Sequence, residues 1–581
     1  MTLRSQKLRQ VNAQADSLKL GMGWSPEDLA KPQILVESCE GETHPGSYHL
    51  GQLAEEVRNG LLSRGMKPVS FFATDICDGI AQSHEGMDFS LPSREILAHL
   101  VEIHAQSHQH DGMVLISTCD KAIPAHLIAS ARVNIPAVLL PGGSMDIGPG
   151  GLTENDVAGA FIQWQKGDIT EERFREISQG ACPSCGACQF MGTASTMQVL
   201  TEALGMCLPG AALSPADSNL LQQYARKTGE AIAQAVENNL CPRDIITEKS
   251  LENALVVHAA VGGSTNALLH LPALAYELGL PFPPERVNEI NAKVPYLANI
   301  LPGGKHPARF LWYAGGVPRL LLELKEFLHL DALTVTGKTL EESLGTLEKS
   351  GFFDRGEGYL KNYGLRVSDV IGFEASGGNT RRHEGDSRRG SVAILKGSLA
   401  PEGAVIKYSV FSPELYEFTG PAAVFDREED AYRAIIEKKV EPGSVIVIRY
   451  EGPRATGMPE LYLTTRAVCE SEELAINSIL VTDGRFSGAT FGPVIGHISP
   501  EAMEGGPIAL VENGDMIRFS LSEMKLDIVG LKNAPVSPAE VEQTLARRRQ
   551  SWRKPEPKYR SGVMGLYTRS AASAMDGAYM R

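Results

Sequence analysis

Buried apolar strands alternate with amphipathic helical segments from Ile34 to about Tyr363. The segment GMVLIS at Gly112–Ser117 is almost continuously apolar, and the chain after it becomes helical beyond Pro124. A second apolar strand, IPAVLLPGGS, follows and ends at Pro-Gly-Gly. Strands that are buried on both faces and joined through helices are typical of a mainly parallel sheet covered by helices. The sequence therefore predicts an α/β fold for this part of the chain.

The composition changes at residues 374–391, EASGGNTRRHEGDSRRGS, where glycine, serine and charged residues predominate. We interpret this segment as a linker or mobile loop. Short β-type runs follow, among them SVIVIRY, SILVTDG and KLDIVGL, and we expect a helical tail after about Val536. A chain of 581 residues has room for two cores. We expect an N-terminal α/β domain at 1–375 and a C-terminal domain, a β-sandwich or β-barrel, at 376–581.

The charge balance excludes several classes of partner. With 55 basic and 70 acidic residues the formal net charge is −15, which argues against nucleic acid as the main partner. The first residues, MTLRSQKLRQ, lack the apolar core of a signal peptide, and no apolar run is long enough to span a bilayer. We therefore expect a cytoplasmic protein without a membrane partner, in a compartment that disfavours disulfides.

Three cysteines at two-residue intervals, Cys182, Cys185 and Cys188, lie in the stretch GACPSCGACQFMGTASTM. In the cytoplasm such a group is more often a metal site or a reactive site than a disulfide. A structural zinc site or a fully ligated iron–sulfur carrier uses four ligands. A cluster held by fewer cysteines leaves an iron exposed, which then acts as a Lewis acid. Alternatively, one cysteine is a ligand and the others are small buried residues.

Soft and hard ligands are neighbours in the stretch STCDKAIP, where Cys119 and Asp120 precede Lys121 at a strand end. Cysteine suits iron and aspartate suits Mg²⁺, so the pair suggests two metal centres that meet across one substrate. In DICDGIAQSHEG, the glycine after Asp78 lets the chain turn and aim the carboxylate at a Mg²⁺ site. The alternatives are a surface ion pair and an ordinary turn.

Glycine-rich turns frame two further candidates. Glu460 in RYEGPRATGMPE could complete a hard-metal site, and Ser487 in TDGRFSGATFGPVIGH lies beside Arg485. Ser487 is a candidate nucleophile or base, although serine is also common in turns. In VGGSTNALLHL, Ser264, Thr265 and Asn266 could bind substrate hydroxyls or cap a helix.

Taken together, these stretches resemble one family, the IlvD/Edd dehydratases, which includes dihydroxy-acid dehydratase and phosphogluconate dehydratase. The resemblance runs from about Lys31 to Gly577 and includes SLPSRE, CDK..P, GAC..MGTASTM, VGGSTNALLHL, RYEGP...GMPE, DGRFSG and GHISPEA. It implies an N-terminal α/β domain and a C-terminal β-barrel-like domain with the site between them. It also implies a homodimer or homotetramer that eliminates water from a 2,3-dihydroxy acid to give a 2-keto-3-deoxy acid.

The resemblance assigns roles to individual residues. The family's cluster cysteines match Cys119 and Cys188, and its Mg²⁺ ligands match Asp78, Asp120 and Glu460. Lys121 matches a lysine that is carbamylated in several members, and Ser487 matches the proposed catalytic base. Arg485 and His44 are further candidates for the substrate site. For His44, which lies in HPGSYHL, a purely structural role is the alternative.

The chain departs from the family at the third cluster cysteine. Many members with a [2Fe–2S] cluster have a cysteine where this chain has Gly46. Cys39, Cys185 or Cys182 are the candidate substitutes. The pattern ACPSCGAC resembles members described as having [4Fe–4S] clusters, so we favour [4Fe–4S] over [2Fe–2S].

Two substrate hypotheses follow from the resemblance. The favoured one is an aldonic (sugar) acid, because DICDGIAQSHEG and GACQFMGTAST are closer in character to the sugar-acid members. The alternative is the dihydroxy acid of branched-chain amino-acid synthesis. A sugar acid needs a polar pocket for its extra hydroxyls, whereas a branched substrate needs an apolar one. A non-catalytic electron-transfer or sensing protein would not need the Mg²⁺ carboxylates or DGRFSG.

Overall fold

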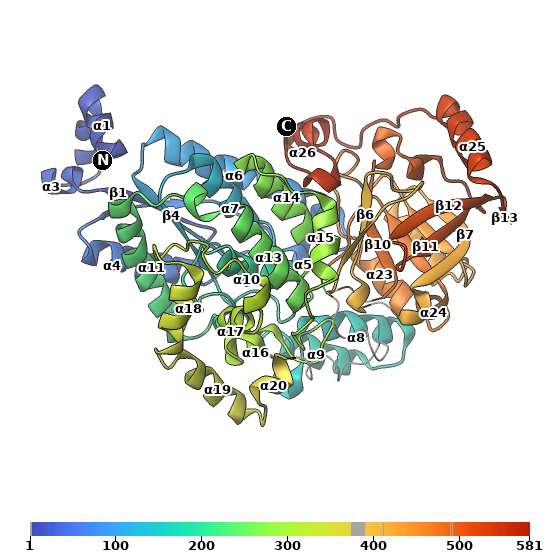
Figure 1. Cartoon of the computed structure of the whole chain (residues 1–581), viewed down its shortest axis with the longest axis horizontal. Helices are drawn as coiled ribbons and strands as arrows, with labels where there is room; N and C mark the ends of the chain where they lie inside the picture. The colour runs from blue at the N-terminus through green and yellow to red at the C-terminus, as the bar shows by residue number, and fades with distance from the viewer. Residues whose placement is uncertain (1–2, 373–389, 411, 489, 491) are drawn as a thin grey trace.

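The N-terminal half is built on a four-stranded parallel sheet. A computed structural model of the chain describes residues 3–372, 390–410, 412–488, 490 and 492–581 (Figure 1). The sheet has the order β2-β1-β3-β4, and its strands are β1 (Gln33–Ser38), β2 (Lys67–Phe72), β3 (Gly112–Ser117) and β4 (Ala137–Pro141). Every residue of β1, β3 and β4 is buried, as expected for a sheet covered on both faces.

Two pairs of helices cover this sheet. Helix α4 (Leu50–Ser63) packs on α11 (Asn219–Asn238), and α6 (Ser90–Ser107) packs on α7 (Ala122–Val133). Right-handed crossovers place α4 on one face and α6 and α7 on the other. A Cβ on Gly229 would lie 2.2 Å from the carbonyl oxygen of Val57, so the α4–α11 crossing depends on glycine.

Further helices surround the sheet and extend toward the second half. The N-terminal and connecting ones are α1 (Arg4–Val11), α2 (Gln14–Leu20), α3 (Pro26–Ala30), α5 (Asp78–Ala81), α8 (Glu154–Lys166), α9 (Glu171–Gly180) and α10 (Thr193–Ala203). The later ones are α12 (Pro242–Ile245), α13 (Glu248–Val261), α14 (Ala267–Leu278), α15 (Pro284–Asn291), α16 (Ala308–Tyr313), α17 (Gly316–Glu323), α18 (Leu340–Glu348), α19 (Phe352–Asn362) and α20 (Val367–Val370). Every residue of α10 is buried, so the chain just after the three-cysteine loop is fixed in the core.

The C-terminal half contains a nine-stranded mixed sheet with the order β13-β12-β11-β7-β8-β9-β10-β6-β5. Its strands are β5 (Ala393–Leu395), β6 (Gly403–Ile406), β7 (Glu417–Phe425), β8 (Val445–Ile448), β9 (Ile479–Thr482), β10 (Val494–Ser499), β11 (Met516–Ser520), β12 (Lys525–Leu531) and β13 (Ala534–Pro535). The middle strands β7 to β10 run parallel, and their outer neighbours are antiparallel. The sheet curls, because Lys396 after β5 donates to the carbonyl of Met524 and accepts from the amide of Leu526.

The α/β prediction for the N-terminal half and the β-rich prediction for the C-terminal half fit this architecture, with a curled mixed sheet as the barrel-like element. The helices α22 (Glu428–Ile436), α23 (Tyr462–Cys469) and α24 (Leu474–Asn477) are additions, since they connect the parallel strands. The predicted linker at 374–391 lies, except for its last two residues, outside the described residues. Within the described chain, no helix combines the length and apolar character needed to cross a membrane.

The tail carries α25 (Pro538–Ser551) and α26 (Gly562–Ser570) and returns to the N-terminal half. Arg94 of α6 donates to the carbonyl of Gly577 at 2.8 Å, and the amide of Met580 donates to Glu95 at 3.0 Å. The last residues of the chain therefore join the two halves.

Candidate active site

The candidate site lies where the strands of the parallel sheet end. Cys119, Asp120 and Lys121 follow β3, and Asp78 lies six residues beyond the end of β2. The carboxyl ends of parallel strands meet at one edge of a sheet, where ligands of α/β proteins bind. A cavity of about 640 Å³ opens there, and Glu460 and Ser487 of the C-terminal half line it together with residues of the N-terminal half.

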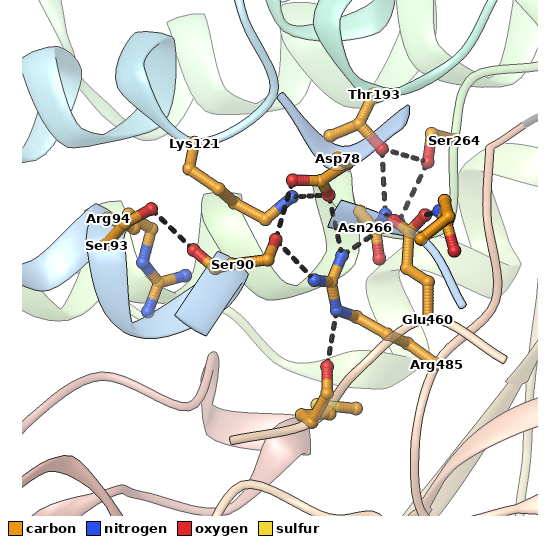
Figure 2. Close-up of polar contacts among 12 residues, drawn as sticks. Asp78, Ser90, Ser93, Arg94, Lys121, Thr193, Ser264, Asn266, Glu460 and Arg485 are labelled. Carbon is orange, nitrogen blue, oxygen red and sulfur yellow. Dashed lines mark hydrogen bonds and ion pairs between the residues drawn. The ribbon is translucent and has the colours of Figure 1, made fainter. Parts of the chain in front are cut away.

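Three carboxylates converge at this cavity. Oxygen atoms of Asp78, Asp120 and Glu460 lie within 4.8 Å of one another. Glu460 is held by donors from both halves: Gln82 at 2.8 Å, Asn266 at 2.7 Å and Arg485 at 2.7 Å. Figure 2 shows Asp78 and Glu460 both directed toward the same guanidinium nitrogen, Nη1 of Arg485. The sequence-predicted hard-metal residues are therefore neighbours.

Two buried cations accompany the three carboxylates. Lys121 Nζ lies 2.6 Å from Asp78 Oδ2, and Arg485 Nη1 lies 3.6 Å from the same oxygen. Burial works against ionisation of Asp78, but the charges of Lys121 and Arg485 outweigh it and lower its pKa. Burial and the charge of Asp78 raise the pKa of Asp120 well above its usual value. The surplus carboxylate charge and the oxygen-only donor set fit a hard divalent cation such as Mg²⁺.

Arg485, a substrate candidate from the sequence, is completely buried. The contacts that the structure shows for it are with protein groups. Its Nε donates to the carbonyl of Met458 at 2.6 Å, and its Nη2 donates to Ser90 Oγ at 2.8 Å. With Glu460 on Nη1, the guanidinium is held on all sides by protein groups. Arg485 therefore fixes the carboxylate of Glu460 beside Asp78.

A hydroxyl and amide network lies behind Glu460 (Figure 2). Asn266 Nδ2 donates to Thr193 Oγ1 at 2.8 Å as well as to Glu460. Ser264 Oγ lies 2.9 Å from Thr193 Oγ1 and accepts a hydrogen bond from the backbone N–H of Asn266 at 3.2 Å. Ser264 thus supports the network around Glu460, and Thr265 beside it is buried. Asn266 was named from the sequence with Ser264 and Thr265, whereas Thr193 was not singled out.

The candidate soft ligands lie beside the carboxylates. Cys188 and Cys182 line the same cavity as Asp78. Cys119 makes a side-chain hydrogen bond with Cys77, which raises the pKa of Cys119 and lowers that of Cys77. Burial raises the pKa of Cys188 well above its usual value. Neighbouring thiols beside a cavity fit an iron–sulfur cluster, because a bound metal would hold them as thiolates.

Two of the candidate third cysteines have surroundings of their own. Cys39 is fully buried and groups with Glu37 and His126, whose ligand atoms lie within 4.8 Å of its sulfur. Cys185 packs against the N-terminal core, and the charged groups that act on it are Asp217 and Arg309. Their role as the third cluster ligand stays a prediction.

His44 borders the thiol group rather than the open cavity. Its Nε2 lies 2.7 Å from Asp75 Oδ1, and its Nδ1 lies 3.6 Å from Cys119 Sγ. Burial alone would lower the pKa of His44, but the hydrogen bond and charge of Asp75 raise it above its usual value. The imidazole therefore bridges Asp75 and the sulfur of Cys119.

Part of the cavity lining is apolar. The apolar side chains come from α8, α9 and α23, which lie near the junction of the two halves (Figure 1), and from the loop before α10. They are Val157, Phe161, Ile162, Phe174, Phe190 and Leu463. Ser487 lines the same cavity as the carboxylates and these side chains.

Comparison with known proteins gives one consistent result. Residues 31–343 match the family profile described as dihydroxy-acid/6-phosphogluconate dehydratase N-terminal, and residues 381–578 match its C-terminal counterpart. A dihydroxy-acid dehydratase of Caldanaerobacter subterraneus subsp. tengcongensis is 42% identical over 97% of this chain and 96% of its own length. One from Ignicoccus hospitalis is 43% identical over 98% of each chain. The chain therefore belongs to the dihydroxy-acid/6-phosphogluconate dehydratase family and is an enzyme of the hydro-lyase class.

Proposed function

We propose that this enzyme removes water from a 2,3-dihydroxy acid with a branched alkyl group and releases the corresponding 2-keto acid. The relatives named above are dihydroxy-acid dehydratases, which supports this alternative over the sugar-acid hypothesis that the sequence favoured. Family membership also counts against a non-catalytic electron-transfer or sensing role.

One observation carries the substrate assignment, namely the apolar part of the cavity lining, here called the apolar wall. The phenyl rings of Phe161 and Phe174 and the side chain of Ile162 line the part contributed by α8 and α9. Burying an alkyl group there is favourable by about 25 cal/mol per Å². A sugar hydroxyl placed against the same wall would lose hydrogen bonds to water without gaining others, at about 1–3 kcal/mol each.

Asp78, Asp120 and Glu460 would hold Mg²⁺, and cysteine thiolates beside them would hold the iron–sulfur cluster, for which we favour [4Fe–4S]. Together these groups supply Lewis acidity, which makes the C2 proton more acidic and stabilises the leaving C3 hydroxyl. Lys121 neutralises Asp78 as an ammonium. If it is carbamylated, as in several family members, it becomes a further oxygen ligand.

Ser487 is the proposed base for the C2 proton. A serine hydroxyl is a poor base at neutral pH, so its alkoxide needs nearby positive charge. Arg485, two residues away, keeps its guanidinium in the site by its bonds to Glu460 and Ser90. After the proton and the hydroxyl have left, the enol tautomerises to the keto acid.

The test is anaerobic turnover with Mg²⁺ on 2,3-dihydroxyisovalerate and on a C5 or C6 aldonate, with detection of 2-keto acid. We expect a higher kcat/KM for the branched substrate. A preference for the aldonate would contradict the assignment and restore the sugar-acid hypothesis. Sedimentation of the same preparation tests the homodimer or homotetramer that the family resemblance implies.

A further inference from the structure

The position that carries a cluster cysteine in many family members has no side chain here. A Cβ on Gly46 would lie 2.3 Å from Cys119 Sγ and 3.2 Å from His44 Nδ1. Position 46 is thus in contact with Cys119, but in this arrangement the space for a thiol is already filled. A third thiolate has to come from another part of the chain.

Cys77 lies next to Cys119, and like Cys119 it directly precedes one of the aspartates of the carboxylate group. The chain contains two Cys-Asp pairs, Cys77–Asp78 after β2 and Cys119–Asp120 after β3. The two aspartates have oxygen atoms within 4.8 Å of one another. Adjacent residues are only ~3.8 Å apart along the chain, so each cysteine lies close to the carboxylate group. The two thiols are near enough to act on one another.

Glu154 connects this pair to Cys188. A Cβ on Gly79 would lie 3.6 Å from Cys77 Sγ and 3.4 Å from Glu154 Oε1, so both atoms face one small space. Glu154 in turn makes a side-chain hydrogen bond with Cys188. Cys77 therefore neighbours both Cys119 and Glu154, and Glu154 neighbours Cys188. The three cysteines come from three different loops.

We propose that Cys77, Cys119 and Cys188 are the three thiolates of the iron–sulfur cluster, with Cys77 replacing the cysteine that other members have at the position of Gly46. This inference rests on the cluster of the proposed function. Asp120 and Cys188 both line the cavity, so a substrate bound there would lie next to a cluster held by these thiolates. Cys182 also lines the cavity and is the competing third ligand.

The test compares single cysteine variants after anaerobic reconstitution with iron and sulfide. The variants are Cys77→Ala, Cys119→Ala, Cys188→Ala and Cys182→Ala, with Cys185→Ala as the matched control from the same loop. The readouts are iron and acid-labile sulfide per chain, visible absorbance, and the EPR spectrum of the reduced protein. We expect Cys77→Ala to lose most of its cluster, as Cys119→Ala and Cys188→Ala do, while Cys182→Ala and Cys185→Ala retain it.

The opposite pattern would overturn the inference: a full cluster in Cys77→Ala and a lost cluster in Cys182→Ala. Far-UV circular dichroism checks that each variant folds. If Cys77→Ala does not fold, Cys77→Ser decides, because an oxygen ligand shifts the EPR signal and an unchanged signal excludes residue 77. Wild-type protein that binds no cluster would refute the proposed function itself, which is a separate outcome.

Discussion

Removal of the Asn266 amide should weaken Mg²⁺ binding without touching a proposed ligand. Asn266 Nδ2 donates to Glu460 Oε1 at 2.7 Å in a fully buried position. A hydrogen bond to a charged group contributes about 1.5–3 kcal/mol, which corresponds to about 10- to 150-fold in an equilibrium constant. Groups that orient metal ligands typically change metal affinity by about 10–100-fold. We therefore expect Asn266→Ala to raise the Mg²⁺ concentration for half-maximal activity by one to two orders of magnitude.

The assay strips Mg²⁺ with EDTA under anaerobic conditions and titrates it back, with activity and calorimetric binding as independent readouts. Gln82→Ala is the matched control, since Gln82 donates to the other oxygen of Glu460 at 2.8 Å but is only partly buried. Water can replace the Gln82 amide, so that variant should shift the half-saturation point much less. Wild-type Mg²⁺ dependence in Asn266→Ala would show that Glu460 is not held for a cation, and the reasoning would fail.

Four further outcomes are expected. Ser487→Ala should lose nearly all turnover while its visible cluster absorbance stays intact, and near-normal activity would remove Ser487 as the base. Phe161→Ala should raise KM for the branched substrate about tenfold, by the loss of alkyl contact, and an unchanged KM would place the alkyl group elsewhere. Gly229→Ala should destabilise the protein by ~1–3 kcal/mol, because its Cβ would meet the Val57 carbonyl at 2.2 Å; an unchanged melting temperature would contradict this. Burial lowers the pKa of Lys407 to about 7, below its value in the unfolded chain, so the fold favours the neutral amine and the protein loses stability as pH falls from about 10 through 7. Lys407→Met should therefore have a higher melting temperature than wild type, and the difference should widen from pH 9 to pH 6. A constant difference would refute the assignment.

The sequence indicated the strands most directly where they are buried on both faces. The runs that became β3 and β4 are continuously apolar, so their position did not depend on distant contacts. The helices between β7 and β9 were missed, because short segments such as Leu474–Asn477 have no helical period long enough to recognise. Their presence depends on the parallel order of the strands, which a local pattern does not specify.

At the site, residue types were predictable but partners were not. The three carboxylates followed from the family resemblance, and the structure brings them together. Arg485 was a candidate because it lies beside Ser487, and its partners Met458, Glu460 and Ser90 became known only from the structure. Cys77 attracted no attention as a single cysteine, although the repeated Cys-Asp pair was a signal that could have found it. Both depend on which segments meet at the end of the sheet, which a local pattern does not specify.

The repeated Cys-Asp pair also explains how two kinds of metal site can be kept in register. Each pair joins a soft ligand to a hard one through a single peptide unit, so the thiols cannot move away from the carboxylates without a change in both loops. Glu460 is not part of such a pair. It comes from the C-terminal half and is held at the site by Asn266, Gln82 and Arg485. Docking of the two halves therefore completes the hard-metal site but not the group of thiols. It follows that a variant that loosens this junction should lose Mg²⁺ binding and turnover before it loses the cluster.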